Sequence, residues 1–93
     1  MPQDALKAFG AGVRALRLQK GLTQEKLAEL SELDQTYISG IERGRRNLGY
    51  RNLVRVARAL GVSGSDLVAE AERLTLSSRR AQNRRPRRTL KDR

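Results

Sequence analysis

The sequence predicts an all-α domain of five short helices, and three observations lead to that prediction. Apolar residues recur three or four positions apart along most of the chain, which is the spacing of one helix face. Cap-forming residues and glycines divide these stretches into helix-sized pieces. No stretch has the strict alternation of a β-strand. With 93 residues, of which 38% are apolar, the chain is long enough for one small domain.

The first helix is expected to end near Gly21. Its apolar stripe consists of Leu6, Phe9, Val13 and Leu16. Its interior also contains Gly10 and Gly12, each of which costs roughly 1 kcal/mol relative to alanine. This helix should therefore be marginal alone and depend on packing against the rest of the domain.

The second and third helices are expected to be short and separated by only a few residues. Thr23 can cap the second, "QEKLAELS". Its inward residues are expected to be Leu27, Ala28 and Leu30. Asp34 can cap the third, which ends at Gly44. Its narrow apolar stripe consists of Ile38 and Ile41.

The fourth helix should follow the loop "RGRRNLG" and stop at Gly61. Its inward residues are expected to be Leu53, Val54, Ala57 and Leu60. Ser63 followed by Asp66 has the capping-box spacing that begins a fifth helix. The apolar residues of that helix are Leu67, Val68, Ala71 and Leu74. Beyond residue 76 the pattern disappears.

The net charge of +10 is unevenly distributed along the chain. Residues 1–76 carry +3, whereas residues 77–93, "SSRRAQNRRPRRTLKDR", carry +7. Because residues 77–93 are almost without apolar side chains, we expect them to be disordered unless bound. The chain thus divides into a helical domain (1–76) and an arginine-rich tail (77–93). Such a charge balance favours polyanionic partners, and solubility alone is the alternative explanation.

The residue types exclude most catalytic and metal chemistry. The chain has no cysteine and no histidine, which excludes disulfides, thiolate zinc sites and imidazole acid–base catalysis. Its carboxylates lie at the spacings of solvated helix faces, without a nucleophile or a phosphate-binding loop. We therefore expect a protein that is not an enzyme and has no cofactor. The absence of a secretory signal or membrane span predicts a cytoplasmic location.

Two short helices joined by a tight turn define a helix-turn-helix arrangement, whose second helix enters the DNA major groove. The exposed residues of "LDQTYISGIERGRRNL" suit that task. Gln35 can offer a donor and an acceptor to an adenine edge, and Thr36 can give a hydroxyl or methyl contact. Tyr37 can reach bases or phosphates, or it can pack on the domain surface with only its hydroxyl exposed.

The run "GLTQEKLAELSELDQTYISGIERGRRNL", continued by "NLVRVARALGVSGSDL", resembles the Cro/C1-type helix-turn-helix family, which includes the lambdoid phage repressors. The resemblance covers roughly residues 6–74, and it implies a five-helix lambda-repressor-like fold. Within the family, the stretch from Leu33 to Leu48 looks most like the controller proteins of restriction–modification systems, which are small dimeric regulators.

The resemblance implies particular residue roles. It implies DNA contacts by Gln24, Gln35, Thr36, Tyr37, Ser39, Arg43, Arg45 and Arg46. Gln24 is expected to contact a phosphate, and the three arginines are expected to meet the backbone or the groove wall. It also implies a structural ion pair between Arg17 and Glu42. Two positions depart from the family pattern. Gly40 replaces a base-reading side chain, and Glu32 replaces the turn glycine, so that turn either accepts a positive φ or takes another shape.

The leading functional hypothesis is a sequence-specific transcription regulator that binds a palindromic operator as a homodimer. A restriction–modification controller, a phage-type repressor and an antitoxin-type autoregulator would all use the same surface. The expected dimer surface is the apolar set of the fifth helix, Leu67, Val68, Ala71 and Leu74. The alternative is RNA or nonspecific polyanion binding through the arginine-rich tail. Double-stranded DNA is the expected partner, without a membrane or a small-molecule ligand, so the expected cytoplasmic location is nucleoid-associated.

Overall fold

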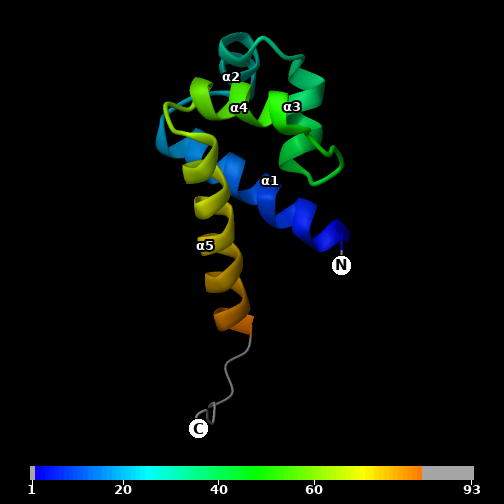
Figure 1. Cartoon of the computed structure of the whole chain (residues 1–93), viewed down its shortest axis with the longest axis vertical. Coiled ribbons are helices and arrows are strands. Elements are labelled where there is room, and N and C mark those ends of the chain that lie inside the picture. Colours follow the sequence, from blue (N-terminus) through cyan, green and yellow to red (C-terminus); the bar gives the residue numbers. More distant parts are fainter. Residues whose placement is uncertain (1, 83–93) are drawn as a thin grey trace, which may run out of the picture.

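The computed structural model describes residues 2–82, with side chains for residues 5–74, and this part of the chain forms five α-helices without a strand (Figure 1). The helices are α1 (Pro2–Gln19), α2 (Gln24–Ser31), α3 (Gln35–Glu42), α4 (Tyr50–Ala59) and α5 (Gly64–Gln82). Helices α2, α3 and α4 gather at one end of α5, and α1 packs against both α5 and α3. The predicted all-α fold is confirmed. Within residues 2–82 no helix is long and apolar enough to cross a membrane.

The hydrophobic core lies where the five helices meet. Its buried members are Val13, Leu16, Leu27, Ala28, Ile38, Ile41, Leu48, Val56, Ala57, Leu60 and Leu67. Every helix contributes at least one residue from the stripe that its spacing predicted. Leu48 comes from the loop before α4, where no periodic pattern could indicate burial. Burying each of its valine, leucine and isoleucine side chains stabilises the fold by about 1.5–3 kcal/mol.

The inward sets predicted for α2 and α4 were partly wrong. Leu30 is 48% exposed, and Ser31 is buried in its place. The Ser31 hydroxyl donates to a backbone carbonyl of the preceding turn at 2.7 Å, so its burial leaves no unsatisfied group. On α4, Val54 is only half-buried, whereas Val56 is fully buried. Val56 lies three and four residues from the flanking leucines of the stripe, which places it on the core side.

Side-chain caps begin two of the helices, as predicted. The hydroxyls of Thr23 and Ser63 each accept a hydrogen bond at 3.0 Å from the amide three residues later. Asp34 occupies the N-cap position of α3, but its side chain makes no capping hydrogen bond. Asp34 is therefore at the predicted N-cap position, but the predicted capping hydrogen bond is wrong. Helix α3 ends just before Gly44, whose φ is +76°.

The two interior glycines of α1 allow neighbouring helices to approach closely. A Cβ at Gly10 would lie 2.2 Å from the carbonyl oxygen of Ile41, at the end of α3. A Cβ at Gly12 would lie 2.8 Å from the Cα of Ala71, on α5. The two glycines lower the intrinsic helix propensity of α1 but allow close contacts with α3 and α5. Helix α1 thus depends on packing, as its sequence predicted.

Helix α5 runs to Gln82 and includes residues 77–82, which the apolar pattern had assigned to the tail. Extending a formed helix adds one backbone hydrogen bond for each residue fixed, and Arg, Ala and Gln have favourable helix propensities. A helix anchored by its buried first half can therefore continue past its last apolar residue. Residues 83–93, the rest of the predicted disordered tail, lie outside the described residues.

Candidate nucleic-acid interface

The turn between α2 and α3 sets the direction of α3. Glu32 has a left-handed conformation, φ 60° and ψ 41°, so of the two alternatives for this turn the one with a positive φ is correct. The amide of Glu32 donates to the carbonyl of Glu29 at 3.2 Å, and the amide of Leu33 donates to that of Ala28 at 3.0 Å. These two bonds form the Schellman arrangement that ends a helix. A left-handed non-glycine residue costs roughly 1 kcal/mol, which the two bonds and the packing of Leu33 on the core offset.

Helix α3 has a buried face and a solvent face. Ile38 and Ile41 are 0% and 1% exposed and hold the helix to the core. Gln35 and Thr36 in the first turn are exposed, and Ser39, one turn after Gln35, is partly exposed. The side chains predicted to reach base edges therefore have access to a partner. A major groove admits an α-helix that presents polar side chains in this way.

A buried polar network joins α3 to α1 and α2. The Arg17 guanidinium binds the Glu42 carboxylate through two hydrogen bonds, Nε to Oε2 at 2.7 Å and Nη2 to Oε1 at 3.0 Å. Its Nη1 also donates to the carbonyl of Leu22 at 2.9 Å. The hydrogen bond to Glu42 raises the pKa of Arg17 above its usual value, against the opposing effect of burial. The structure thus brings the expected ion pair together.

Gln24 belongs to the same network. Its Nε2 donates to Glu42 Oε1 at 3.0 Å from the first position of α2. The carboxamide expected to reach a phosphate is therefore held by α3, in a fixed position at the start of α2. One amide proton and the carboxamide oxygen of Gln24 make no hydrogen bond among the described residues.

Tyr37 is packed on the domain, which is one of the two roles that the sequence left open, and its contact with DNA stays a prediction. Its ring packs against the core and is only partly exposed. Its hydroxyl accepts a hydrogen bond from Asn52 Nδ2 at 3.2 Å, and the Arg46 guanidinium carbon lies 5.8 Å from the ring centroid. That separation is within the range of a cation–π contact. Tyr37 is thus both a packed side chain and a member of the candidate interface.

Gly40 gives the Arg46 side chain its place on α3. A Cβ at Gly40 would lie 2.6 Å from Arg46 Cγ, so the Arg46 stem occupies the space that a side chain would need. The missing side chain at Gly40 therefore permits a close approach of Arg46 within the chain itself. Arg46 remains exposed, and its guanidinium is held over the Tyr37 ring on α3.

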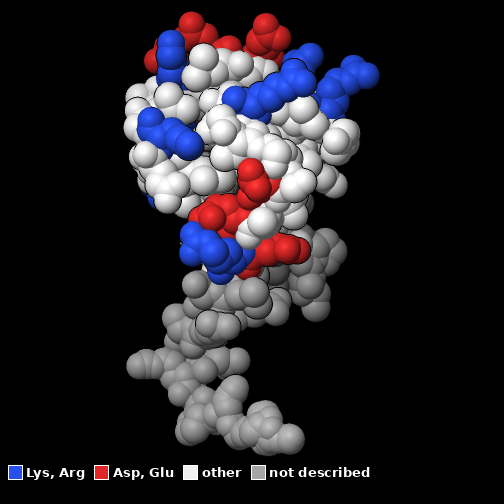
Figure 2. Space-filling model, turned by 60° about the vertical axis from the view of Figure 1, so that its left-hand side comes forward, with Lys and Arg blue, Asp and Glu red and all other residues white. Residues whose placement is uncertain are grey.

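The charges of the candidate interface are not neutralised within the domain. Arg43, Arg45 and Arg46 are all exposed, and none forms an ion pair with another described side chain. Figure 2 shows several blue basic side chains over the upper part of the molecule, with red acidic groups along its top edge, and red acidic groups next to a blue one at the lower end of the described surface. An exposed cation without a carboxylate partner is suited to contact a phosphate oxygen. The described residues contain no cluster of His, Cys, Asp or Glu that could hold a metal ion.

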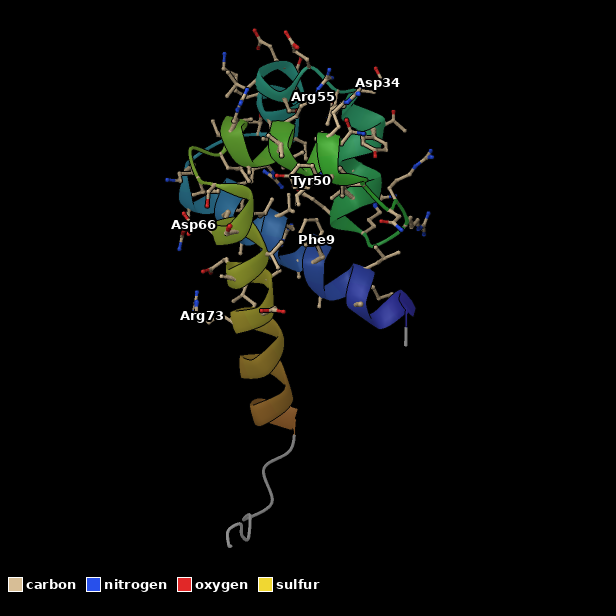
Figure 3. The ribbon with its side chains drawn as sticks, viewed as in Figure 1. Phe9, Asp34, Tyr50, Arg55, Asp66 and Arg73 are labelled. Carbon is tan, nitrogen blue, oxygen red and sulfur yellow. The ribbon has the colours of Figure 1, made fainter. Side chains whose placement is uncertain are left out.

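Sequence reasoning missed that α4 contacts the candidate interface through Tyr37. Asn52 reaches Tyr37 from the first turn of this helix, and its neighbours Tyr50 and Arg51 are exposed, Tyr50 at 79%. Figure 3 shows Tyr50 and Arg55 along α4, which lies beside the loop that carries the arginines. The available signal was a polar face opposite the apolar stripe of α4, directly after an arginine-rich loop.

The expected dimer residues divide into two groups. Leu67 and Ala71 are 0% and 5% exposed, because they pack inside their own domain, so they were wrongly placed on a partner surface. Val68 is 37% exposed, and Leu74 is partly exposed. Only Val68 and Leu74 of the predicted set have surface to offer a second subunit.

Comparison with known proteins gives matches across these helices. A family model described as helix-turn-helix matches residues 13–67. The control protein C.BamHI of Bacillus amyloliquefaciens is 49% identical over 61 residues, which are 64% of this chain and 75% of that protein. The transcriptional regulator y4dJ of Sinorhizobium fredii, described as uncharacterized, is 41% identical over 76 residues, 82% of this chain and 99% of that protein. The crystal structure of the restriction-modification controller C.AhdI from Aeromonas hydrophila has a TM-score of 0.66 and 47% identity, covering 67% of this chain and 94% of that chain.

Proposed function

The chain belongs to the Cro/C1-type helix-turn-helix family of DNA-binding transcription regulators, and we propose that it controls transcription by binding a palindromic operator as a homodimer. The observation that carries this proposal is the solvent face of α3. Gln35 and Thr36 are exposed in its first turn, which is the part of a recognition helix that touches base edges. The protein is not an enzyme.

The arrangement supports separate residues for contacts with DNA bases and for contacts with the DNA backbone. Gln35, Thr36 and Ser39 supply hydrogen-bonding groups on α3 that can discriminate base edges. Arg43 and Arg45 lie in the following loop, where unneutralised cations can contact phosphates and hold the helix in register. Gln24, held by Glu42 at the start of α2, can contact a further phosphate.

Similarity to the control protein C.BamHI and to the restriction–modification controller C.AhdI supports a controller role for this chain. A phage-type repressor and an antitoxin-type autoregulator use the same DNA-binding surface, and identification of the controlled genes distinguishes the three.

Selection of bound sequences from a random duplex library by the full chain tests the proposal. We expect a palindrome whose half-sites are about one helical turn apart, because a two-fold dimer presents its two recognition helices at that spacing. Recovery of no preferred sequence would reject sequence-specific regulation. RNA binding as tight as binding to the selected duplex would favour the alternative function through the arginine-rich tail.

The dimer is tested at Val68, the outward apolar residue of α5. Val68→Glu should shift the chain from dimer to monomer in sedimentation experiments and weaken operator binding, because a charge would replace apolar contact area. Ala69→Glu adds the same charge at the neighbouring exposed position and should leave the dimer intact. A wild-type monomer at operator-binding concentrations would contradict the proposed assembly.

A further inference from the structure

The hydroxyl of Tyr37 is held by a residue of another helix. Asn52, on α4, donates a hydrogen bond from its amide nitrogen to the Tyr37 oxygen at 3.2 Å, and the contact is partly buried. A tyrosine hydroxyl has one proton to donate and lone pairs to accept. The Asn52 bond occupies a lone pair and leaves the proton free to be donated elsewhere.

That proton has no acceptor among the residues that the structure describes. The backbone of residues 2–82 and the side chains of residues 5–74 provide Tyr37 with the Asn52 bond alone. The ring is also fixed, since it packs on the core below and lies next to the Arg46 guanidinium. Both the ring and the polarity of the hydroxyl are therefore set before any partner binds.

We infer that Asn52 is a positioning residue for DNA recognition, which makes the Tyr37 hydroxyl a hydrogen-bond donor to an acceptor on the duplex. The acceptor is either a phosphate oxygen or an acceptor atom on a base edge in the major groove. This inference rests on the proposed function, because it requires α3 to be the helix that faces DNA. It adds α4 to the recognition surface without a direct contact between Asn52 and the nucleic acid.

Two physical effects make the arrangement useful. A hydroxyl that already accepts a hydrogen bond becomes a better donor, because the two bonds polarise each other. A side chain ordered in the free protein loses less conformational freedom on binding. Both effects act through the hydroxyl, so they vanish when Tyr37 becomes phenylalanine.

A double-mutant cycle on the full-length protein tests this coupling. Asn52→Leu removes the amide donor at similar volume, and Tyr37→Phe removes the hydroxyl. Each should weaken binding to the selected operator about threefold to tenfold, as expected for one hydrogen bond. The double variant should bind no more weakly than Tyr37→Phe alone. Losses that multiply in the double variant would overturn the inference.

Asn52→Asp provides a sharper second test, because a carboxylate accepts the Tyr37 proton and reverses the polarity of the hydroxyl. Its charge also repels phosphates, and this repulsion is the same whether residue 37 is tyrosine or phenylalanine. We therefore expect Asn52→Asp to weaken binding severalfold more in the tyrosine background than in the phenylalanine background. Equal losses in both backgrounds would overturn the inference, even if Asn52→Leu folds poorly.

Comparing the operator with a random duplex identifies the acceptor. Equal loss on both duplexes indicates a phosphate oxygen, and loss confined to the operator indicates a base edge. Thermal unfolding followed by circular dichroism should show that the Asn52→Asp variants remain folded at the assay temperature. A wild-type protein that selects no sequence would reject the proposed function, whereas a selected operator without Asn52–Tyr37 coupling would reject this inference alone.

Discussion

Arg17 and Arg46 both lie against α3, yet one is buried with a carboxylate and the other is exposed without one. Arg17 is 7% exposed and binds the Glu42 carboxylate through two hydrogen bonds, so its charge is neutralised inside the domain. Arg46 is exposed, lies over the Tyr37 ring and has no ion pair with a described side chain. A guanidinium that is buried with a carboxylate needs that partner, because either charge alone would be buried unpaired. One that is exposed without a carboxylate can bind a phosphate.

The charge of Arg17 does not change with pH around neutrality. Its hydrogen bond to Glu42 raises the pKa of Arg17 in the folded state above the unfolded value. When folding raises the pKa of a cation, the charged form stabilises the folded state. This stabilisation is complete at any pH below the pKa of the unfolded state, and it is lost only as the pH rises through the pKa of the folded state. Because both values lie far above neutral pH, Arg17 stays charged throughout the working range.

The largest expected effect follows from breaking the buried pair. Arg17→Leu or Glu42→Leu should each lower the free energy of unfolding by about 3–5 kcal/mol, because the remaining charge is buried without its partner. The double variant should recover part of that loss. Urea unfolding followed by circular dichroism measures all three values. Additive losses would show that the two residues do not act as a pair.

The next effect tests the close approach of α1 to α3. Gly10→Ala should lower the free energy of unfolding by about 1–3 kcal/mol, because the added methyl group meets the Ile41 carbonyl and the backbone must move. Gly64→Ala is the matched control, since the nearest atom to its added Cβ is 3.9 Å away. The control should be neutral or stabilising by up to about 1 kcal/mol. Equal behaviour of the two variants would contradict the proposed helix contact.

On the exposed side, Gln35→Ala should weaken operator binding by about 1–3 kcal/mol and relax the preference at one base pair of each half-site. Stability should hardly change, because Gln35 is exposed and makes no hydrogen bond to a described residue. Binding measurements on the operator and on a random duplex separate the two cases. A similar loss on both would assign Gln35 to the DNA backbone.

The smallest effect concerns the loop arginines. Arg45→Ala should weaken binding to every duplex alike and lower the salt slope of the binding constant by about one, as expected for one phosphate contact. Arg73→Ala, which removes the same charge from α5, should leave the slope unchanged. Titrations at several salt concentrations give these slopes. A changed base preference in the Arg45 variant would instead indicate direct readout of a base.

The sequence by itself determined the helices and most of the core. Local rules were sufficient, because a cap such as Thr23, a helix-ending glycine such as Gly44 and apolar residues three or four apart each act within one or two turns. The same local information identified the exposed polar start of α3, and with it Gln35 and Thr36. The resemblance to a known family then supplied the pairing of Arg17 with Glu42.

Only the tertiary structure decided which distant residues meet. Gly10 and Gly12 look unfavourable in an isolated helix, and their value depends on Ile41 and Ala71, which lie on other helices. Asn52 has no recognisable motif, because its hydrogen bond to Tyr37 crosses 15 residues. Contacts of this kind depend on how helices cross, which the spacing of residues along one helix does not specify.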